Sequence, residues 1–184
     1  SDISIRCLMR PRPGDFLYTK EELTMLHQQI LQLKAAGADG FVIGCLTAEG
    51  ELDADAMKPL IEACGDCGIT LHRCIDVSQD LGKTYRDAAA LGIDTILTSG
   101  GASSCKLGFE QISRLAALRD EWNGPEILVG AGVNAAVITE FRRIESVFIS
   151  LLLEMILIVL SLSSPKPQTA RKQLEILLRK KKFP

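Results

Sequence analysis

Two arginines stand close together in a stiff segment, CLMRPRPGDFLY, that directly follows an apolar run. Arg10 and Arg12 each carry a planar guanidinium group, which pairs well with carboxylates and phosphates. Pro11 and Pro13 restrict the backbone around them. A loop that needed only solubility would more naturally use lysine and serine, so this segment predicts a site that binds an anion.

Polar groups also follow other apolar runs of the chain. His72, Arg73 and Asp76 come at the end of one such run, and His72 and Asp76 are candidates for proton transfer. The GAG triplet before a predicted helix is a familiar way to bring backbone N–H groups near an anion. The predicted anion-binding residues are Arg10, Arg12, Arg73, Ser99, Gly100, Gly130 and Gly132.

The cysteines offer a different chemistry, because thiolates suit soft metal ions such as Cu(I). Cys45, Cys74 and His72 are the candidate metal ligands, since we expect His72 and Cys74 to share one face of a strand. Buried cysteine is also commonly a small core residue, which is the alternative for both thiols. The Cys64–Cys67 pair is predicted at a helix end, where a simple turn is favoured over a metal pair.

These residues are positioned by a regular alternation of apolar strand-like runs and helical segments. Such repetition predicts parallel strands covered by helices, either as an open doubly wound sheet or as a barrel. Both architectures place their chemistry at the carboxyl ends of the strands. We predict strands near residues 3–9, 40–45, 69–74, 94–98, 126–130 and 146–151, and helices at 19–37, 53–64, 81–92, 108–122 and 134–144.

Five blocks in order, RPRPGDF, GADGFVIGCLT, ITLHRCID, ILTSGGASS and LVGAGV, resemble the CutC family of copper homeostasis proteins. The resemblance covers about residues 5–138. It implies an α/β TIM (β/α)8-barrel, incomplete here with about six βα units and lacking the first two. It also implies a cytoplasmic protein linked to copper handling and proposed to bind Cu(I).

The chain departs from the family pattern in several places. Pro13 replaces a glycine and Ile75 stands where the family usually has phenylalanine. The cysteines proposed to bind copper in the family lie in the two absent units, so none of them can be carried over. The first and last strands would be unpaired unless a tail, a strand swap or another chain covers them, which predicts poor solubility or homo-oligomers.

The carboxyl-terminal end differs in composition from the rest. We divide the chain into a partial barrel at 1–150 and an atypical apolar, then basic, tail at 151–184. The apolar stretch 146–162 has three interpretations, namely an altered chain end, an ordinary buried strand and helix, or a membrane anchor. An anchor on an incomplete barrel would be unusual, so membrane association is not favoured.

Charge and composition narrow the function classes. A net charge of −2 argues against non-specific nucleic-acid binding, and no secretory leader opens the chain. Three functions remain, which are a cytosolic copper-binding homeostasis protein, a barrel enzyme acting on a small anionic or phosphorylated substrate, and an inactive fragment. The arginines favour an anionic ligand because they repel cations, whereas the family resemblance favours copper.

Overall fold

The structure is a computed structural model that describes residues 4–141, 144, 147–148 and 155–159. Its centre is one seven-stranded sheet in the order β6-β5-β4-β3-β2-β1-β7, and every strand pair is parallel. The strands are β1 Ser4–Leu8, β2 Gly40–Ile43, β3 Gly68–Leu71, β4 Thr95–Thr98, β5 Glu126–Val129, β6 Val147–Phe148 and β7 Met155–Val159.

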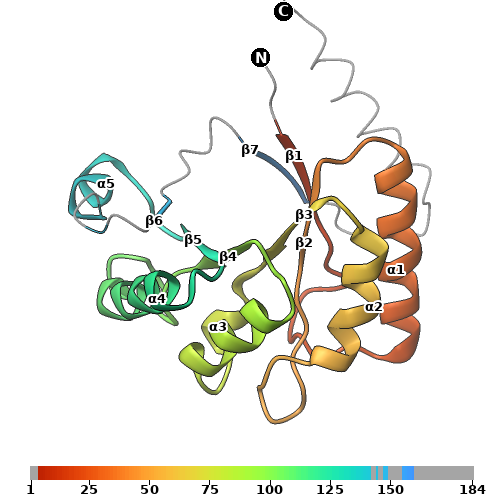
Figure 1. The fold of residues 1–184 in the computed structure, drawn as a ribbon, viewed down its shortest axis with the longest axis horizontal. Helices are drawn as coiled ribbons and strands as arrows, with labels where there is room; N and C mark the ends of the chain where they lie inside the picture. The colour runs from red at the N-terminus through yellow and green to blue at the C-terminus, as the bar shows by residue number, and fades with distance from the viewer. Residues whose placement is uncertain (1–3, 142–143, 145–146, 149–154, 160–184) are drawn as a thin grey trace, which may run out of the picture.

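Helices alternate with the strands along the chain and cover the outer face of the curved sheet (Figure 1). The predicted α/β alternation is therefore confirmed, with a short 3-10 helix in addition. The helical elements are α1 Lys20–Ala35, α2 Ala54–Cys64, η1 Arg73–Val77, α3 Leu81–Ala90, α4 Phe109–Trp122 and α5 Ala135–Phe141.

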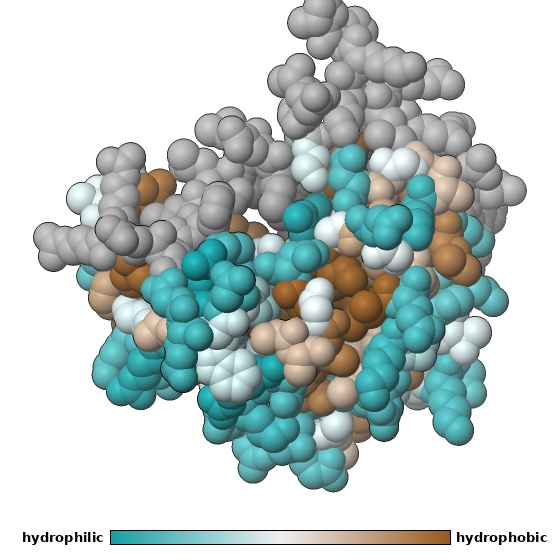
Figure 2. Space-filling view, in the orientation of Figure 1, coloured by the Kyte–Doolittle hydropathy of each residue, from teal (hydrophilic) through white to brown (hydrophobic). Residues whose placement is uncertain are grey.

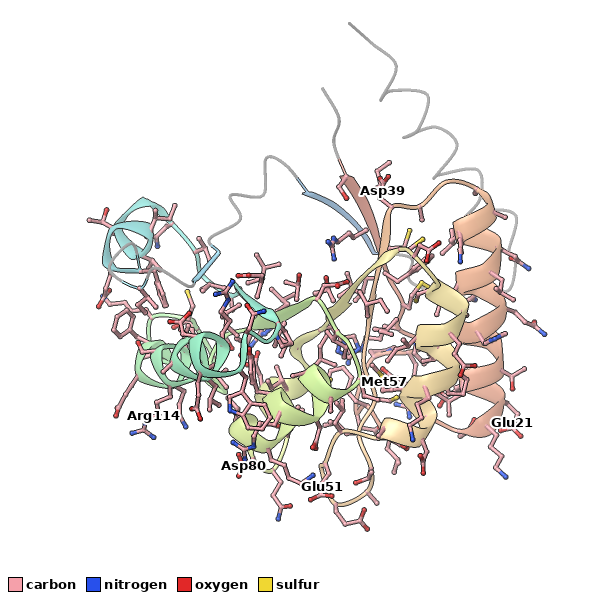
Figure 3. All side chains as sticks on the ribbon, viewed as in Figure 1. Glu21, Asp39, Glu51, Met57, Asp80 and Arg114 are labelled. Carbon is pink, nitrogen blue, oxygen red and sulfur yellow. The ribbon has the colours of Figure 1, made fainter. Side chains whose placement is uncertain are left out.

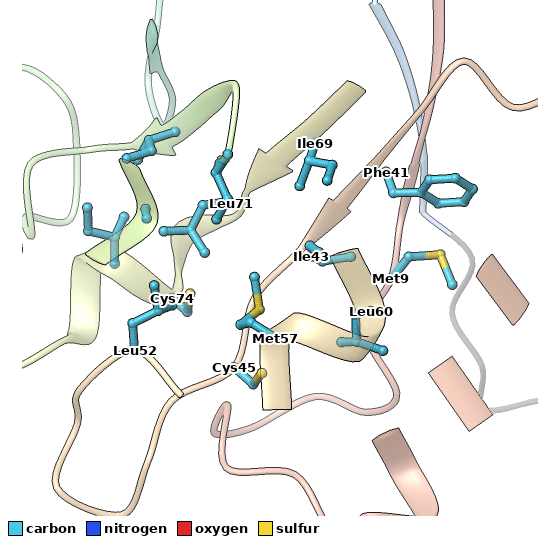
Figure 4. Packing of buried hydrophobic residues seen from close by; sticks show 14 of the residues in the cluster. Met9, Phe41, Ile43, Cys45, Leu52, Met57, Leu60, Ile69, Leu71 and Cys74 are labelled. Carbon is cyan, nitrogen blue, oxygen red and sulfur yellow. The ribbon is translucent and has the colours of Figure 1, made fainter. Parts of the chain in front are cut away.

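The core lies between the sheet and its helices. Ile5 and Cys7 alternate with less buried neighbours along β1, so one face of the strand belongs to the core that also holds Leu26 of α1. Figure 4 shows the next part of this core, where Met57 from α2 packs near Ile43 of β2. Hydrophobic residues at the centre of the visible face lie between the hydrophilic outer surfaces of the helices (Figure 2).

Side chains at the helix starts fix where each helix begins. The predicted capping box of α1 is confirmed, because Thr19 accepts from the Glu22 amide and the Glu22 carboxylate accepts from the Thr19 amide. The Asp53 side chain caps α2 by accepting from the Ala56 amide, and Asp80 caps α3 by accepting from the Lys83 amide. These caps set the lengths of the loops that follow the strands.

The sheet must be curved. Phe148 ends β6 and Met155 begins β7, so these two residues lie at most about 25 Å apart along an extended chain. Seven strands in a flat sheet would separate the two edge strands by about 29 Å. The short connection therefore holds the edges nearer than a flat sheet allows, as expected for part of a barrel.

The strand β7 is the main departure from the sequence-based expectation. Six strands were predicted, and the outer edge of β1 was expected to be unpaired unless a tail covered it. The structure instead pairs β7 with β1 in parallel, from Ser4 opposite Met155 to Leu8 opposite Val159. A buried strand was one of the three interpretations of 146–162, and its apolar, β-branched composition at Met155–Val159 explains the pairing.

The rest of the tail, including the basic stretch after residue 165, lies outside the described residues. Among the residues that are described, no helix is both long and apolar enough to cross a bilayer. The proposed division at residue 150 stays a prediction, although part of the segment that follows it joins the sheet.

Gly108 sits where two backbone segments meet, which gives a direct test of the fold. A Cβ at this position would lie 1.9 Å from the Ser99 carbonyl oxygen, so Gly108→Ala should lower the free energy of unfolding by roughly 2 kcal/mol or more. Gly82→Ala is the matched control, because the new methyl would meet only ordinary contacts inside α3. That control should be neutral or stabilise by about 0.5 kcal/mol. Urea midpoints for the two variants measure the difference.

Candidate ligand-binding site

The loop after β1 crosses the carboxyl end of β2. The Leu46 amide donates to the Phe16 carbonyl oxygen at 2.8 Å, which fixes the loop over the neighbouring strand. Figure 3 shows this end of the molecule, with Glu51 and Asp80 there and Asp39 at the opposite end. The arginine segment therefore lies at the end of the sheet where parallel α/β proteins carry their sites.

An arginine, a phenylalanine and a histidine stack at this end. The Arg10 guanidinium carbon lies 4.7 Å from the centroid of the Phe16 ring. The Phe16 and His72 ring centroids are 4.8 Å apart with an interplanar angle of 41°. Arg10 is also held by the Gly14 carbonyl oxygen, which accepts from Nη2 at 2.6 Å. Two predicted residues from different loops are thereby brought together through Phe16.

His72 lies at the end of a strand that is shorter than expected. The strand was predicted to continue to residue 74, with His72 and Cys74 on one face, and this is wrong because β3 ends at Leu71. His72 instead caps η1, and its Nδ1 accepts a hydrogen bond from the Cys74 amide at 3.2 Å. This local hydrogen bond competes with the sheet ladder and turns the chain.

The same contact fixes the tautomer of His72. Burial, aided by the nearby Arg10 guanidinium, lowers the pKa of His72 to about 4, so the ring is neutral at pH 7. A neutral imidazole whose Nδ1 accepts a hydrogen bond carries its proton on Nε2. His72 therefore presents an Nε2–H donor at the carboxyl end of the sheet.

Three buried polar atoms at this end have no hydrogen-bond partner within the described residues. They are Arg10 Nε, Tyr18 Oη and His72 Nε2. Burial raises the pKa of Tyr18, so its phenol stays protonated and can donate. Phe16 contacts both Arg10 and His72, and Tyr18 follows Phe16 by two residues in the same loop. We call Arg10, Tyr18 and His72 the donor cluster.

The Arg12 side chain, in contrast, is hydrogen-bonded to partners within the chain. Its Nε donates to Glu22 at 2.7 Å and its Nη2 donates to Asp15 at 2.8 Å and to the Leu17 carbonyl oxygen at 2.8 Å. Two carboxylates therefore balance its charge, and hydrogen bonding to Asp15 raises the pKa of Arg12. Arg12 ties the loop to the start of α1.

Asp76 organises a second group of polar residues. Its side chain is only 5% exposed and accepts from Arg73 Nε at 2.6 Å and from the Thr98 hydroxyl at 2.5 Å. The amides of Ser99 and Gly101 donate to it at 3.0 Å each. Burial raises its pKa, but hydrogen bonds from Thr98 and Arg73 outweigh this and lower the pKa below its usual range. These contacts give Asp76 a structural role as an ionised carboxylate.

The other predicted anion-binding residues take part in turns and packing. Arg73 also donates to the Ser99 hydroxyl at 2.7 Å. A Cβ on Gly100 would lie 2.4 Å from the Gly108 carbonyl oxygen, so glycine is required there. Gly130 leaves room for a Leu97 methyl group, and Gly132 has a φ of +81° that favours glycine.

The candidate metal ligands lie past the strand ends, inside the core. Cys45 and Cys74 are both buried (Figure 4), and burial raises the pKa of Cys45 to about 12 and that of Cys74 further. Across the described parts of the chain, no three or more His, Cys, Asp or Glu side chains are grouped so as to hold a metal ion. The assignment of Cys45, Cys74 and His72 as metal ligands stays a prediction. Cys64 and Cys67 lie at the end of α2, as predicted.

Comparison with known proteins decides the family. The CutC family model matches residues 1–150. A CutC family protein from Xanthomonas campestris pv. campestris (strain B100) is 41% identical over 140 residues, which are 76% of this chain and 58% of the relative. One from Bacteroides fragilis (strain YCH46) is 40% identical over 131 residues, 71% of this chain and 51% of the relative.

This chain belongs to the CutC family. It spans between half and three fifths of the length of these curated relatives. The crystal structure of a copper homeostasis protein CutC from Streptococcus agalactiae matches with a TM-score of 0.72 and 27% identity, covering 83% of this chain and 70% of that one. The predicted fold is thus confirmed as an incomplete TIM barrel of the α/β class.

Sequence reasoning missed one member of the donor cluster of this CutC chain, Tyr18, and two residues that pack beside the cluster, Phe16 and Gly44. Phe16 and Tyr18 stand in the same loop as the arginines, in the sequence GDFLY, and both turn inward. Gly44 was also missed, although a Cβ there would lie 2.6 Å from Cys74 Sγ and 2.7 Å from His72 Cε1. Large aromatic residues in a short polar loop were the available signal.

Asp76 should give the CutC chain a pH-dependent part of its stability. Its folded pKa is lowered, so the stabilisation is complete above the unfolded pKa of about 3.9 and is lost as pH falls through the lower folded value. Asp76→Asn should therefore cost about 2 kcal/mol at pH 7, and much less at the acid end. Asp55→Asn, whose side chain is 95% exposed, is the control and should change little. Denaturant unfolding of both variants at pH 7 and pH 3 measures the effect.

Proposed function

We propose that this CutC chain binds a small anionic ligand through the donor cluster, within a protein that serves copper homeostasis in the cytoplasm. The homeostasis role is supported by the membership in the CutC family and by the name of the Streptococcus agalactiae relative. The cytoplasmic location is supported by the six cysteines, all of which are free thiols.

The observation that carries the anion proposal is the set of three buried donors without an acceptor. An unsatisfied buried donor costs about 1–3 kcal/mol, and more when the group is charged. Arg10 Nε–H, Tyr18 O–H and His72 Nε2–H are all donors in the protonation states that their surroundings favour. A ligand that brings negatively charged oxygen atoms would satisfy all three together, whereas a cation would meet the Arg10 charge.

The surroundings of the donor cluster would strengthen such an interaction. The Phe16 ring contacts both Arg10 and His72, which puts apolar surface beside their polar groups. Charge-assisted hydrogen bonds gain strength where the local dielectric constant is low. The loop itself is braced by Arg12, so the donors are held in place before a ligand arrives.

Copper binding is a second candidate, supported by the two buried thiols. Cys45 directly follows Gly44, and a Cβ on Gly44 would lie 2.6 Å from Cys74 Sγ, so the two cysteines belong to the same part of the core and are the pair that could share one Cu(I) ion. Binding would release both thiol protons, because a thiolate is the ligand. His72 would have to give up its hydrogen bond from Cys74 to take part through Nδ1.

Arg10→Gln should weaken binding of small anions such as acetate or phosphate by at least tenfold, because it removes the charge-assisted hydrogen bond. Tyr18→Phe keeps the ring and removes only the hydroxyl donor, so it should weaken binding about fivefold. Arg114→Gln on the exposed face of α4 is the control and should bind like the unmodified chain. Calorimetric titration gives the three affinities. Equal binding by Arg10→Gln and the unmodified chain would refute the proposal.

Substitutions of the cysteines test copper binding separately from anion binding. Cys45→Ser should abolish Cu(I) binding at the strand ends, whereas Cys64→Ser should leave it intact because Cys64 ends α2. Competition against a chromophoric Cu(I) chelator measures both. Tight Cu(I) binding that survives substitution of Cys45, Cys64 and Cys74 would show that the metal lies elsewhere.

A further inference from the structure

We propose that Cys64 and Cys67 form a reversible disulfide within one chain, by exchange with a small-molecule disulfide such as oxidised glutathione. The inference goes beyond the proposed function and does not depend on it, because this pair lies at the opposite end of the sheet from the donor cluster. The Gly68 amide, directly after Cys67, donates to the Asp39 carbonyl oxygen at 3.2 Å, and Figure 3 labels Asp39 at that end.

The chain between the two cysteines is a tight turn. The Cys67 amide donates to the Cys64 carbonyl oxygen at 3.3 Å, which closes a four-residue β-turn. Gly65, its first central residue, has a φ of 59° and a ψ of −123°, the angles of a type II′ turn. The outer Cα atoms of a β-turn lie within about 7 Å of each other, and a disulfide joins Cα atoms about 4.4–6.8 Å apart. The backbone therefore holds the two cysteines at a separation that a disulfide can bridge.

The sheet keeps Cys7 from competing for Cys67. Cys7 lies on β1, opposite Phe41 of β2. Cys67 directly precedes β3, whose first residue, Gly68, pairs with Gly40 of β2. The two cysteines therefore lie on opposite sides of β2 and are separated by two strand spacings, about 9.6 Å. A disulfide does not bridge Cα atoms more than about 7 Å apart without backbone movement.

Cys67 is the thiol that a dissolved oxidant can reach. It is half-buried, whereas the other five cysteines are buried, and its neighbours Gly65 and Asp66 are exposed. Its thiol donates only a weak hydrogen bond, to the Ala38 carbonyl oxygen at 3.6 Å. Burial, and then the Cys67 thiolate, raise the pKa of Cys64 to about 12, so the Cys64 thiol stays protonated at pH 8. Cys67 therefore makes the first attack.

A lysine ammonium group lies against the turn. Lys34 stands in the last turn of α1, and a side chain at Gly65 would collide with its Nζ. A positive charge beside a thiol favours the thiolate, which is the nucleophile in disulfide exchange. Lys34 accordingly lowers the pKa of Cys64, against the larger effect of burial. The lysine thus assists both cysteines when they lose their protons.

The exchange takes place in two balanced steps. The Cys67 thiolate attacks one sulfur of oxidised glutathione, so a mixed disulfide forms, the original S–S bond breaks and one glutathione thiolate leaves. The Cys64 thiol then gives its proton to water and attacks the Cys67 sulfur, which releases the second glutathione thiolate. Two cysteine thiols are oxidised to a disulfide, and one glutathione disulfide is reduced to two thiols that take up the two protons.

The test treats the reduced full chain with oxidised glutathione at pH 8 in the absence of denaturant. Acid stops the reaction, and the free thiols are then alkylated in urea. After reduction, a second alkylating reagent marks the cysteines that had been oxidised, and mass spectrometry locates them. We expect Cys64 and Cys67 to be marked together, roughly ten times as often as Cys45 or Cys74.

Two variants separate the steps. Cys64→Ser should stop at the mixed disulfide, with one glutathione held on Cys67. Lys34→Gln should slow the first step about threefold, because the charge that favours the thiolate is removed. Lys58→Gln is the matched control, since this exposed lysine is paired with Asp55 on α2, and its rate should equal that of the unmodified chain.

Other outcomes overturn the proposal. Glutathione that stays on Cys67 of the unmodified chain, with Cys64 still reduced, would show that the turn does not bring the two sulfurs together. Marking of Cys45 with Cys74 would assign the reactive pair to the other end of the sheet. Absence of any oxidised cysteine would show that the turn does not exchange with glutathione. Equal rates for Lys34→Gln and the unmodified chain would overturn the role of the lysine.

Discussion

The hydrogen bond from the Cys74 amide to His72 Nδ1 connects most features of the carboxyl end of the sheet. It ends β3 at Leu71 and starts the 3-10 turn that carries Arg73 and Asp76. It also holds the neutral imidazole in the tautomer that presents Nε2–H. Gly44 is required beside it, because any side chain there would collide with both His72 and Cys74. The position of the donor cluster and the role of Asp76 both follow from this contact.

Many polar groups lie at the carboxyl end of the sheet, but most of them already pair with one another and are not available to a ligand. Carboxylates of the chain satisfy Arg12, Arg73 and the amides of the turn after β4. These pairs stabilise the loops and hold them rigid, which reduces the entropy lost on binding. Arg10 is treated differently, since an aromatic ring and a carbonyl oxygen support it without neutralising it. The support of the site and its binding surface are thus built from different arginines of one loop.

The sequence was sufficient for the architecture, because apolar runs and caps such as Thr19 with Glu22 report local structure directly. It placed Arg10 and His72 at one end of the sheet, since parallel strands bring their carboxyl ends together. It could not show that the side chains of Arg12 and Asp76 are occupied by partners within the chain. Each has several charged or polar residues near it in the sequence, and only the fold decides which of them it contacts. The end of β3 was misplaced because one side-chain hydrogen bond from His72 overrode an apolar pattern. The pairing of β7 with β1 depended on the closure of the sheet, which no local pattern reports.

Nitrogen NMR of the imidazole rings tests the central claim most directly. The chain has only two histidines, so His27 provides an internal reference for His72. The account predicts that His72 at pH 7 shows an unprotonated Nδ1 and a protonated Nε2, unchanged down to pH 5. The Nε2 resonance should then shift when formate is added, while that of His27 does not. A His72 ring that is protonated on Nδ1 at pH 7, or that titrates near 6.5 like a free histidine, would contradict it.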